Sequence, residues 1–134
     1  MVPEPLALAL RTEVGRLRLR ESRRVFDTAV HLGTLGGAHD VFVARSGDLP
    51  VLDTALRTDV LARLLEHVVA PGPDLWLTRS GHPEPYEEDV AWLASASAAC
   101  AMHARALGGC FVVTRYGWRD VRTGESRRWK RLRL

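Results

Sequence analysis

Short apolar segments rich in branched side chains alternate with longer segments of helical periodicity along this chain. The segments 40–45, 74–78 and 110–114 carry β-branched and aromatic residues between turn-forming residues, which predicts buried strands. The segments 58–69 and 87–107 place apolar or small residues at helical spacing, which predicts helices. This alternation predicts an α/β (α+β) fold in which about three helices flank a single mixed sheet.

The first part of the chain divides into an arm and the start of this fold. We predict residues 1–21 as an N-terminal arm, in which the alternating residues 15–20 form a possible edge strand. Ser22 is a good helix cap, and the apolar residues that follow it up to residue 32 lie at helical spacing, so a further helix is predicted there. Residues 22–134 then form a single α/β domain.

Three further strands are predicted from weaker patterns. Residues 50–56 predict a short strand before the helix that Thr58 caps, and residues 116–121 predict the second arm of a hairpin. Residues 129–134 alternate polar and apolar side chains and predict a basic C-terminal strand. If this strand paired with the one predicted at 15–20, their arginines would repel unless an acidic group or an anionic partner lay alongside.

Length and composition favour one domain inside the cell. A chain of 134 residues can bury one ordinary core and is too short for two comfortable ones. No apolar run approaches the roughly 20 residues that a membrane helix needs, and Arg11 interrupts the first apolar stretch too early for a signal peptide. Cys100 and Cys110 fall in a predicted helix and a predicted strand, where reduced thiols serve as small apolar fillers. We therefore expect a cytoplasmic protein without membrane contact.

Positive charge is concentrated near the two ends of the chain, although the formal net charge is only +3. Six arginines lie between residues 11 and 24, and eight basic residues against two acidic ones lie in residues 115–134, whereas residues 40–89 are acidic. Such asymmetry suits a face for phosphate groups or for an acidic partner, and it equally suits solvated surface arginines.

The most specific segment is the predicted strand, loop and helix start from Leu75 to Val90, whose loop reads Ser80-Gly-His-Pro-Glu-Pro-Tyr-Glu-Glu-Asp89. It resembles the loop of the RadC-like branch of the JAB/MPN (JAMM) metalloprotease-fold domains, where a strand ends in His-x-His-Pro, continues Ser-Gly-x-Pro-x-Pro-Ser and enters a helix through x-x-Asp. The flanking predicted elements agree as well. The resemblance covers residues 40–121 and implies a JAB/MPN-like fold.

In that family, two histidines and an aspartate hold a zinc ion, an upstream glutamate works on the bound water, and a serine supports the transition state. Catalytic zinc needs three protein ligands and an open position. Carried over residue by residue, the histidine positions fall on Trp76 and Thr78 and the serine position falls on Tyr86. Only Asp89 matches a ligand, and no upstream glutamate stands at a convincing place. The resemblance therefore implies a scaffold without catalytic residues, metal or cofactor. The positions equivalent to the family site are Trp76, Thr78, Ser80, Gly81, Tyr86 and Asp89.

Two other groupings contain residue types that bind metals. His82 lies in the same loop and could join Asp89 as a displaced ligand pair, although such a histidine is more often a surface hydrogen-bonding residue. Cys100, His103 and Cys110 superficially suggest zinc, but alanine-rich surroundings favour a packed core face. No glycine loop of the phosphate-binding or dinucleotide-binding type follows a predicted strand, which disfavours nucleotide binding.

Three function hypotheses follow from these patterns. The first is a non-catalytic JAB/RadC-like domain, a pseudoenzyme that acts through protein contacts, including a homodimer that covers apolar surface around Trp76, Trp92 and Trp118. The second is a nucleic-acid-binding accessory protein, since arginines interleaved with aromatic residues can neutralise phosphates and stack bases. Its candidate residues are Arg115, Arg127, Arg128, Trp129, Lys130, Arg131 and Arg133. The third is an unrecognised metal-dependent hydrolase that uses His82 and Asp89.

Overall fold

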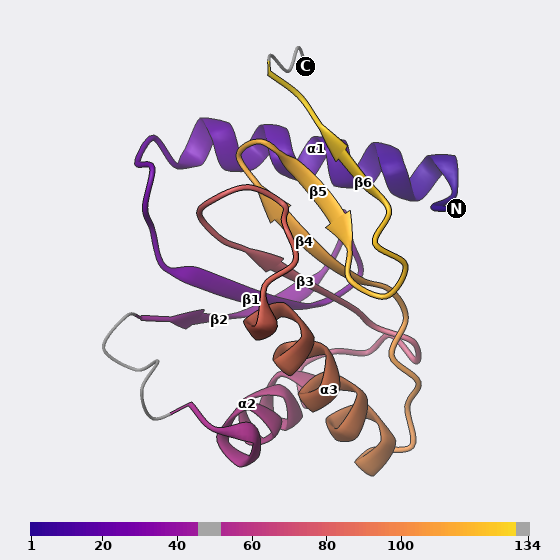
Figure 1. Ribbon diagram of the computed structural model, residues 1–134. Coiled ribbons are helices and arrows are strands. Elements are labelled where there is room, and N and C mark those ends of the chain that lie inside the picture. Colours follow the sequence, from indigo (N-terminus) through magenta and orange to yellow (C-terminus); the bar gives the residue numbers. More distant parts are fainter. Residues whose placement is uncertain (46–51, 131–134) are drawn as a thin grey trace.

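A six-stranded mixed sheet forms the centre of the protein, with helices on both of its faces (Figure 1). The computed structural model describes residues 1–45 and 52–130. The strands are β1 (Thr28–Gly33), β2 (His39–Ala44), β3 (Asp74–Thr78), β4 (Cys110–Thr114), β5 (Gly117–Asp120) and β6 (Ser126–Arg128), and the helices are α1 (Glu4–Arg20), α2 (Thr54–Leu65) and α3 (Glu87–Met102). The strand order is β2-β1-β3-β4-β5-β6. The α+β fold with a mixed sheet and three helices confirms the predicted fold class at this level.

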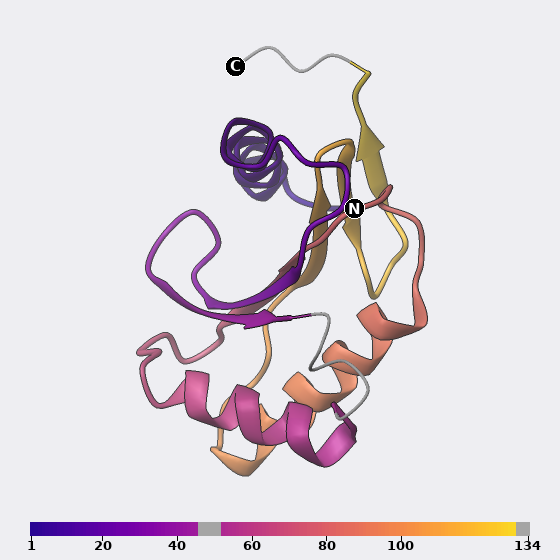
Figure 2. The ribbon, with the colours of Figure 1, turned by 90° about the vertical axis from the view of Figure 1, so that its left-hand side faces the viewer.

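Helix α1 covers one face of the sheet over β4 and β5, and Figure 2 shows it end-on above the sheet. Its buried side chains Leu10, Val14 and Leu17 lie at helical spacing, so they form one apolar stripe. This stripe joins a core cluster with Trp76 and Trp118 of the sheet. The N-terminal helix is therefore part of the hydrophobic core.

Helices α2 and α3 contact each other and cover the opposite face, below the sheet in both views (Figures 1 and 2). Helix α3 connects β3 to β4, which are the one parallel pair among the described strands. Its small residues, such as Ala96 and Ala99, are fully buried and let the helix lie close to the sheet. The loop that precedes α3 is placed at the end of β3 by this crossover.

The structure corrects two predictions for the first third of the chain. Residues 15–20, predicted as an edge strand of an arm, form the end of α1, because Leu17 packs inward whereas Leu19 stays 81% exposed. The segment after Ser22, predicted as a helix, has no regular structure up to residue 27 and then forms β1, which pairs on both sides with β2 and β3. A short apolar run satisfies both periodicities, and pairing with the sheet decides between them. The supposed pairing of two arginine-rich strands does not exist, because one of them is helical.

The boundaries of three other elements also differ from the predictions. Helix α2 begins at Thr54 rather than Thr58, because the Asp53 carboxylate caps it by accepting a hydrogen bond from the Leu56 N–H. The strand predicted over 50–56 is therefore wrong where it overlaps this helix, and its first two residues lie outside the described residues. Helix α3 ends at Met102, before the predicted end at residue 107.

The central and C-terminal strands follow the predictions more closely. Strands β2, β3 and β4 confirm the segments 40–45, 74–78 and 110–114, and β5 confirms the hairpin arm. The last described strand, β6, precedes the predicted strand 129–134. That prediction is wrong for Trp129 and Lys130, which lie outside any strand, and residues 131–134 lie outside the described residues. The three residues of β6 are all exposed, in contrast to β4, which is buried throughout.

None of the described helices has the length and apolar character that are required to cross a bilayer.

The two cysteines lie in the protein interior, as predicted. Cys100 and Cys110 are both free thiols and both buried, which confirms them as core fillers. Burial raises the pKa of Cys110 to about 12, so its thiol stays protonated.

Candidate functional site

The loop between β3 and α3 is organised around the guanidinium group of Arg79. The Nε and Nη2 atoms donate hydrogen bonds to the two carboxylate oxygens of Asp89, at 3.0 and 2.9 Å. Nη1 donates to the carbonyls of Ser80 and His82, at 3.2 and 2.9 Å, and Nη2 also donates to the carbonyl of Glu84 at 2.7 Å. The ion-paired side chains are only 4% and 3% exposed. The loop therefore closes over a buried ion pair in which every guanidinium nitrogen has a partner.

Asp89 also ties this ion pair to the start of α3. Its carboxylate accepts a hydrogen bond from the Tyr86 N–H at 3.2 Å, and the Tyr86 ring centroid lies 3.7 Å from the guanidinium carbon of Arg79. Gly81 permits the tight turn between them, since its φ is +86° and an added Cβ would lie 2.7 Å from the Tyr86 hydroxyl. A carboxylate in the first turn of a helix interacts favourably with the helix dipole, and Asp89 has a second role as the buried partner of Arg79.

The positions that the resemblance assigns to zinc-binding histidines are occupied by side chains with structural contacts. Trp76 is fully buried in the core cluster beneath α1. Thr78 is 2% exposed, and its hydroxyl shares a hydrogen bond of 2.9 Å with Nε2 of His31. Because both oxygens of Asp89 are engaged by Arg79, the chemistry that this arrangement supports is charge neutralisation inside the loop.

His31 is a buried histidine of β1. No role was predicted for it, because a single histidine in an apolar run carries no motif. Its ring stacks on Trp76 with centroids 5.2 Å apart and lies 5.2 Å from the ring of His39. Burial, with smaller contributions from the neighbouring His39 and Arg20, lowers the pKa of His31 to about 3, so the ring is neutral near pH 7. The Nδ1 atom of His39 is already hydrogen-bonded to the Gly37 carbonyl at 2.8 Å.

The structure does not bring the predicted metal-binding groupings together. The ring of His82 stacks on Tyr116, with centroids 4.4 Å apart, instead of pairing with the buried carboxylate of the loop. Cys100 and Cys110 lie in the core, whereas His103 is exposed at the end of α3. In the part of the chain that the structure describes, no three His, Cys, Asp or Glu side chains gather where they could hold a metal ion.

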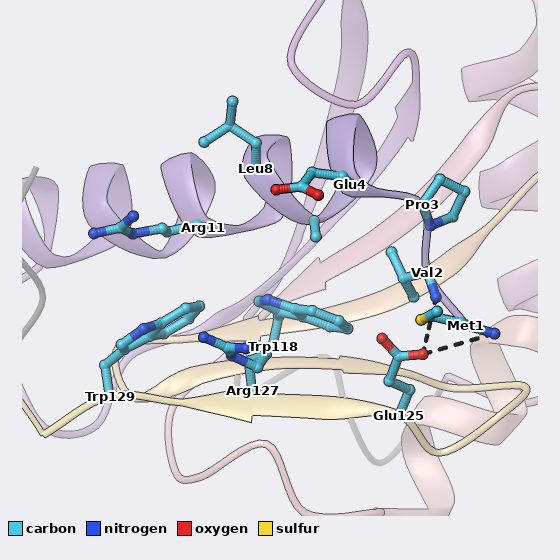
Figure 3. Close-up of a pocket in the computed structure, with 11 residues that line it drawn as sticks. Met1, Val2, Pro3, Glu4, Leu8, Arg11, Trp118, Glu125, Arg127 and Trp129 are labelled. Atoms are coloured by element: carbon cyan, nitrogen blue, oxygen red, sulfur yellow. Dashed lines mark hydrogen bonds and ion pairs between the residues drawn. The ribbon is translucent and has the colours of Figure 1, made fainter.

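A second candidate site is a cavity of about 560 Å³ between α1 and the outer strands β5 and β6 (Figure 3). We call it the α1–β6 groove. Trp118 is 1% exposed and lies at the bottom of the groove, and Trp129 is half-buried beside it. The side chains that define its walls are Glu4, Leu8 and Arg11 of α1 and Trp118, Glu125, Arg127 and Trp129 of the strand side.

Hydrogen bonds tie the groove together along its length. The Val2 N–H donates to the Glu125 carboxylate at 2.9 Å. Toward the opposite end, Nη2 of Arg18 donates to the carbonyl of Trp129 at 2.9 Å. The guanidinium carbon of Arg127 lies 5.7 Å from the centroid of the Trp129 ring, which is within range of a cation–π contact. The groove therefore combines charged and aromatic side chains on a supported framework.

The predicted nucleic-acid-binding residues are only partly brought together. Arg127 and Trp129 line the α1–β6 groove. Arg128 forms an ion pair with Glu84 of the loop, and it lies on the other face of β6 because side chains alternate along a strand. Of the others, Arg115 is half-buried, Lys130 is exposed, and Arg131 and Arg133 lie outside the described residues.

The prediction that apolar surface around three tryptophans is available to a homodimer is wrong. Trp76, Trp92 and Trp118 are 0%, 0% and 1% exposed, because they fill the core clusters on the two faces of the sheet. Exposed apolar side chains occur instead on the edge strand β2, where Val41 and Val43 are 40% and 44% exposed.

No protein-family model, no curated protein and no solved structure matches this chain. The resemblance to JAB/MPN domains thus rests on the loop between β3 and α3 and on the elements that flank it.

Proposed function

We propose that this chain is a non-catalytic domain on a JAB/MPN-like, RadC-like scaffold, and that it acts through contacts with a protein partner. The order of elements around the loop supports the scaffold, since α2 precedes β3 and α3 and β4 follow it. The loop also keeps the glycine, proline and aspartate spacing of the family pattern. The expected location is the cytoplasm.

The observation that carries this proposal is the buried ion pair between Arg79 and Asp89. In the resembled family, the aspartate at this position is a zinc ligand. Here a guanidinium group occupies both of its oxygens and neutralises its charge. A zinc ion at the same carboxylate would have to displace this arginine and leave a buried cation without its partner, which is costly.

Metal analysis of the purified protein tests the proposal. We expect far less than one zinc ion per chain, both as purified and after incubation with zinc followed by desalting, and no gain in melting temperature with zinc. Stoichiometric zinc that is lost in the Asp89→Ala variant would contradict the proposal. The exposed variant Glu66→Ala, on the surface beyond α2, is the matched control for loss of a carboxylate.

The contact between Arg127 and Trp129 favours nucleic-acid binding as a second candidate function. It predicts retention on heparin and an affinity for single-stranded oligonucleotides that falls steeply with salt. Changing Arg127, Arg128 and Lys130 together to alanine should weaken this binding, whereas the exposed Arg63→Ala on α2 should not. An affinity that does not respond to salt would exclude this function.

A further inference from the structure

The sheet ends at β6, and the hydrogen bonds of this strand show which of its peptide groups point outward. The Asp120 N–H donates to the Glu125 carbonyl at 2.8 Å, and the Trp129 N–H donates to the Tyr116 carbonyl at 2.9 Å. Both are directly opposed pairs in the register of β5 with β6. In an antiparallel ladder, hydrogen-bonded and non-bonded pairs alternate.

The alternation directs the peptide groups of Ser126 and Arg128 away from β5. Both residues are exposed, and no hydrogen bond to another part of the described chain engages their backbone. Arg127, between them, uses its peptide group for the bond to β5 and turns its side chain toward α1. Strand β6 therefore offers a free edge directly beside the α1–β6 groove.

Side chains along the groove change in charge from one end to the other. Figure 3 shows Glu4 on the helix side and Glu125 on the strand side nearer to Met1, whose ammonium group pairs with Glu125, and it shows Arg11 on the helix side and Arg127 on the strand side nearer to Trp129. Along β6 and its two flanking residues, Glu125, Arg127 and Trp129 place a carboxylate, a guanidinium and an indole at every second position, and all three line the groove. A complementary ligand would carry a cation, an anion and an apolar group at the same spacing.

We propose that the α1–β6 groove binds an extended peptide segment of a partner protein, which adds as an antiparallel strand to the free edge of β6. This inference rests on the proposed protein-binding function and names the surface and the chemistry of the partner. The peptide backbone would exchange hydrogen bonds with Ser126 and Arg128. Read from its N-terminus, the peptide places an apolar residue opposite Trp129, an acidic residue opposite Arg127 and a basic residue opposite Glu125, at alternate positions.

The groove suits such a peptide better than a nucleic acid. Glu125 accepts a hydrogen bond from the Val2 N–H and lies 3.8 Å from the Met1 ammonium group. A basic residue of the peptide would join this pair and could also meet Glu4, whereas a phosphate at this end would meet two carboxylates. A free strand edge presents alternating N–H and C=O groups, which match another backbone. Trp129 is packed against the core cluster beneath α1, so much of its ring is not available to stack on a base.

Fluorescence anisotropy with two labelled heptapeptides tests this proposal. The first, Thr-Val-Thr-Glu-Thr-Lys-Thr, has the proposed order, and the second exchanges its Glu and Lys. We expect the protein to bind the first about tenfold more tightly, and we expect Arg127→Glu to reverse this preference. The matched control Arg63→Glu, on the other face of the sheet, should leave the preference unchanged.

A backbone variant separates strand addition from simple charge attraction. Ser126→Pro removes an outward N–H that β5 does not use, and proline is compatible with an edge strand. It should weaken binding of the first peptide about fivefold or more, whereas Ser126→Ala should not. Circular dichroism and melting of both variants check that they fold alike.

Several results would overturn the proposal. These are the absence of saturable binding of the first peptide up to about 1 mM, equal affinity for the two peptides, or insensitivity to Ser126→Pro. Preferential binding of a labelled oligo-dT of comparable length at the same site, lost in Arg127→Glu, would assign the groove to nucleic acid instead. The zinc measurement is independent of these outcomes, so metal-free protein that binds no peptide refutes the groove alone.

Discussion

Two arginines, one in the loop between β3 and α3 and one in the α1–β6 groove, show how differently the same side chain is used. Arg79 is 4% exposed and satisfies all of its donors inside the loop. Arg127 is exposed, and its contact is with the face of an indole ring. The first guanidinium has no capacity left for a ligand, whereas the second can still donate to one. The loop arginine therefore stabilises the fold, whereas the groove arginine has donors available for a ligand.

The largest expected effect tests the buried side of this comparison. Arg79→Ala should lower the free energy of unfolding by about 3–5 kcal/mol, because it leaves the Asp89 carboxylate buried without a partner. Arg128→Ala removes an arginine from an ion pair with Glu84 whose side chains are 50% and 52% exposed, and it should cost less than about 1 kcal/mol. Urea denaturation of both variants gives the two values. Equal losses would mean that the loop pair does not depend on burial.

Acidification is expected to have the next largest effect, through His31 within the buried stretch of β1. Its pKa is lowered to about 3 in the folded protein from 6.5, so between these values only the unfolded state binds the proton. The free energy of unfolding is therefore not reduced by His31 above pH 6.5. Below that pH it decreases by up to about 1.4 kcal/mol per pH unit.

The variant His31→Gln isolates this contribution, since an amide can still bond to the Thr78 hydroxyl but does not titrate in this range. Between pH 7 and pH 5, we expect the wild type to lose about 2 kcal/mol more than the variant. Parallel pH profiles of the unfolding free energy for the two proteins would show that His31 is not held neutral.

A smaller effect is expected when the turn of the loop is altered. Gly81→Ala should cost about 1–3 kcal/mol, because φ is +86° and the added Cβ would lie 2.7 Å from the Tyr86 hydroxyl. Gly124→Ala is a matched control with φ +83°, where the nearest atom is the end of the Arg119 side chain at 3.1 Å. We expect a smaller cost there, of about 1 kcal/mol. Equal melting temperatures for the two variants would mean that contact with the Tyr86 hydroxyl does not constrain the turn at Gly81.

The smallest effect is expected in the groove. Arg127→Ala should change the free energy of unfolding by no more than about 0.5 kcal/mol, because the guanidinium is exposed and belongs to no ion pair in the described part of the chain. Chemical denaturation measures this directly. A loss comparable to that of Arg79→Ala would make the groove a structural element, and the distinction between the two sites would fail.

Sequence patterns predicted correctly those elements whose apolar composition and flanking turn residues indicate the same structure. The buried strands β3 and β4 are bounded by turn residues and occupy the predicted ranges 74–78 and 110–114. The patterns failed where a short run fits two periodicities, as in β1, and where an alternating segment is the end of a longer helix, as in residues 15–20. In both places, contacts with distant parts of the sheet decided the outcome.

The candidate sites divide in the same way. That Trp76 and Thr78 stand at the histidine positions of the resembled family, and Asp89 at its aspartate position, can be read directly from the residue order. That Arg79 takes the carboxylate of Asp89 could not be read from it, because their pairing depends on how the loop folds back across ten positions. Likewise, the α1–β6 groove joins the first turns of the chain to its last described strand.

Local order along the chain thus determined which segments are apolar enough to enter a sheet, and which side chains are absent from the metal positions of the resembled family. Only the tertiary structure decided which arginines are buried and which remain free to bind. The physical reason is that burial and hydrogen bonding of a charge depend on groups brought together from distant positions, whereas propensity and periodicity are properties of neighbouring residues.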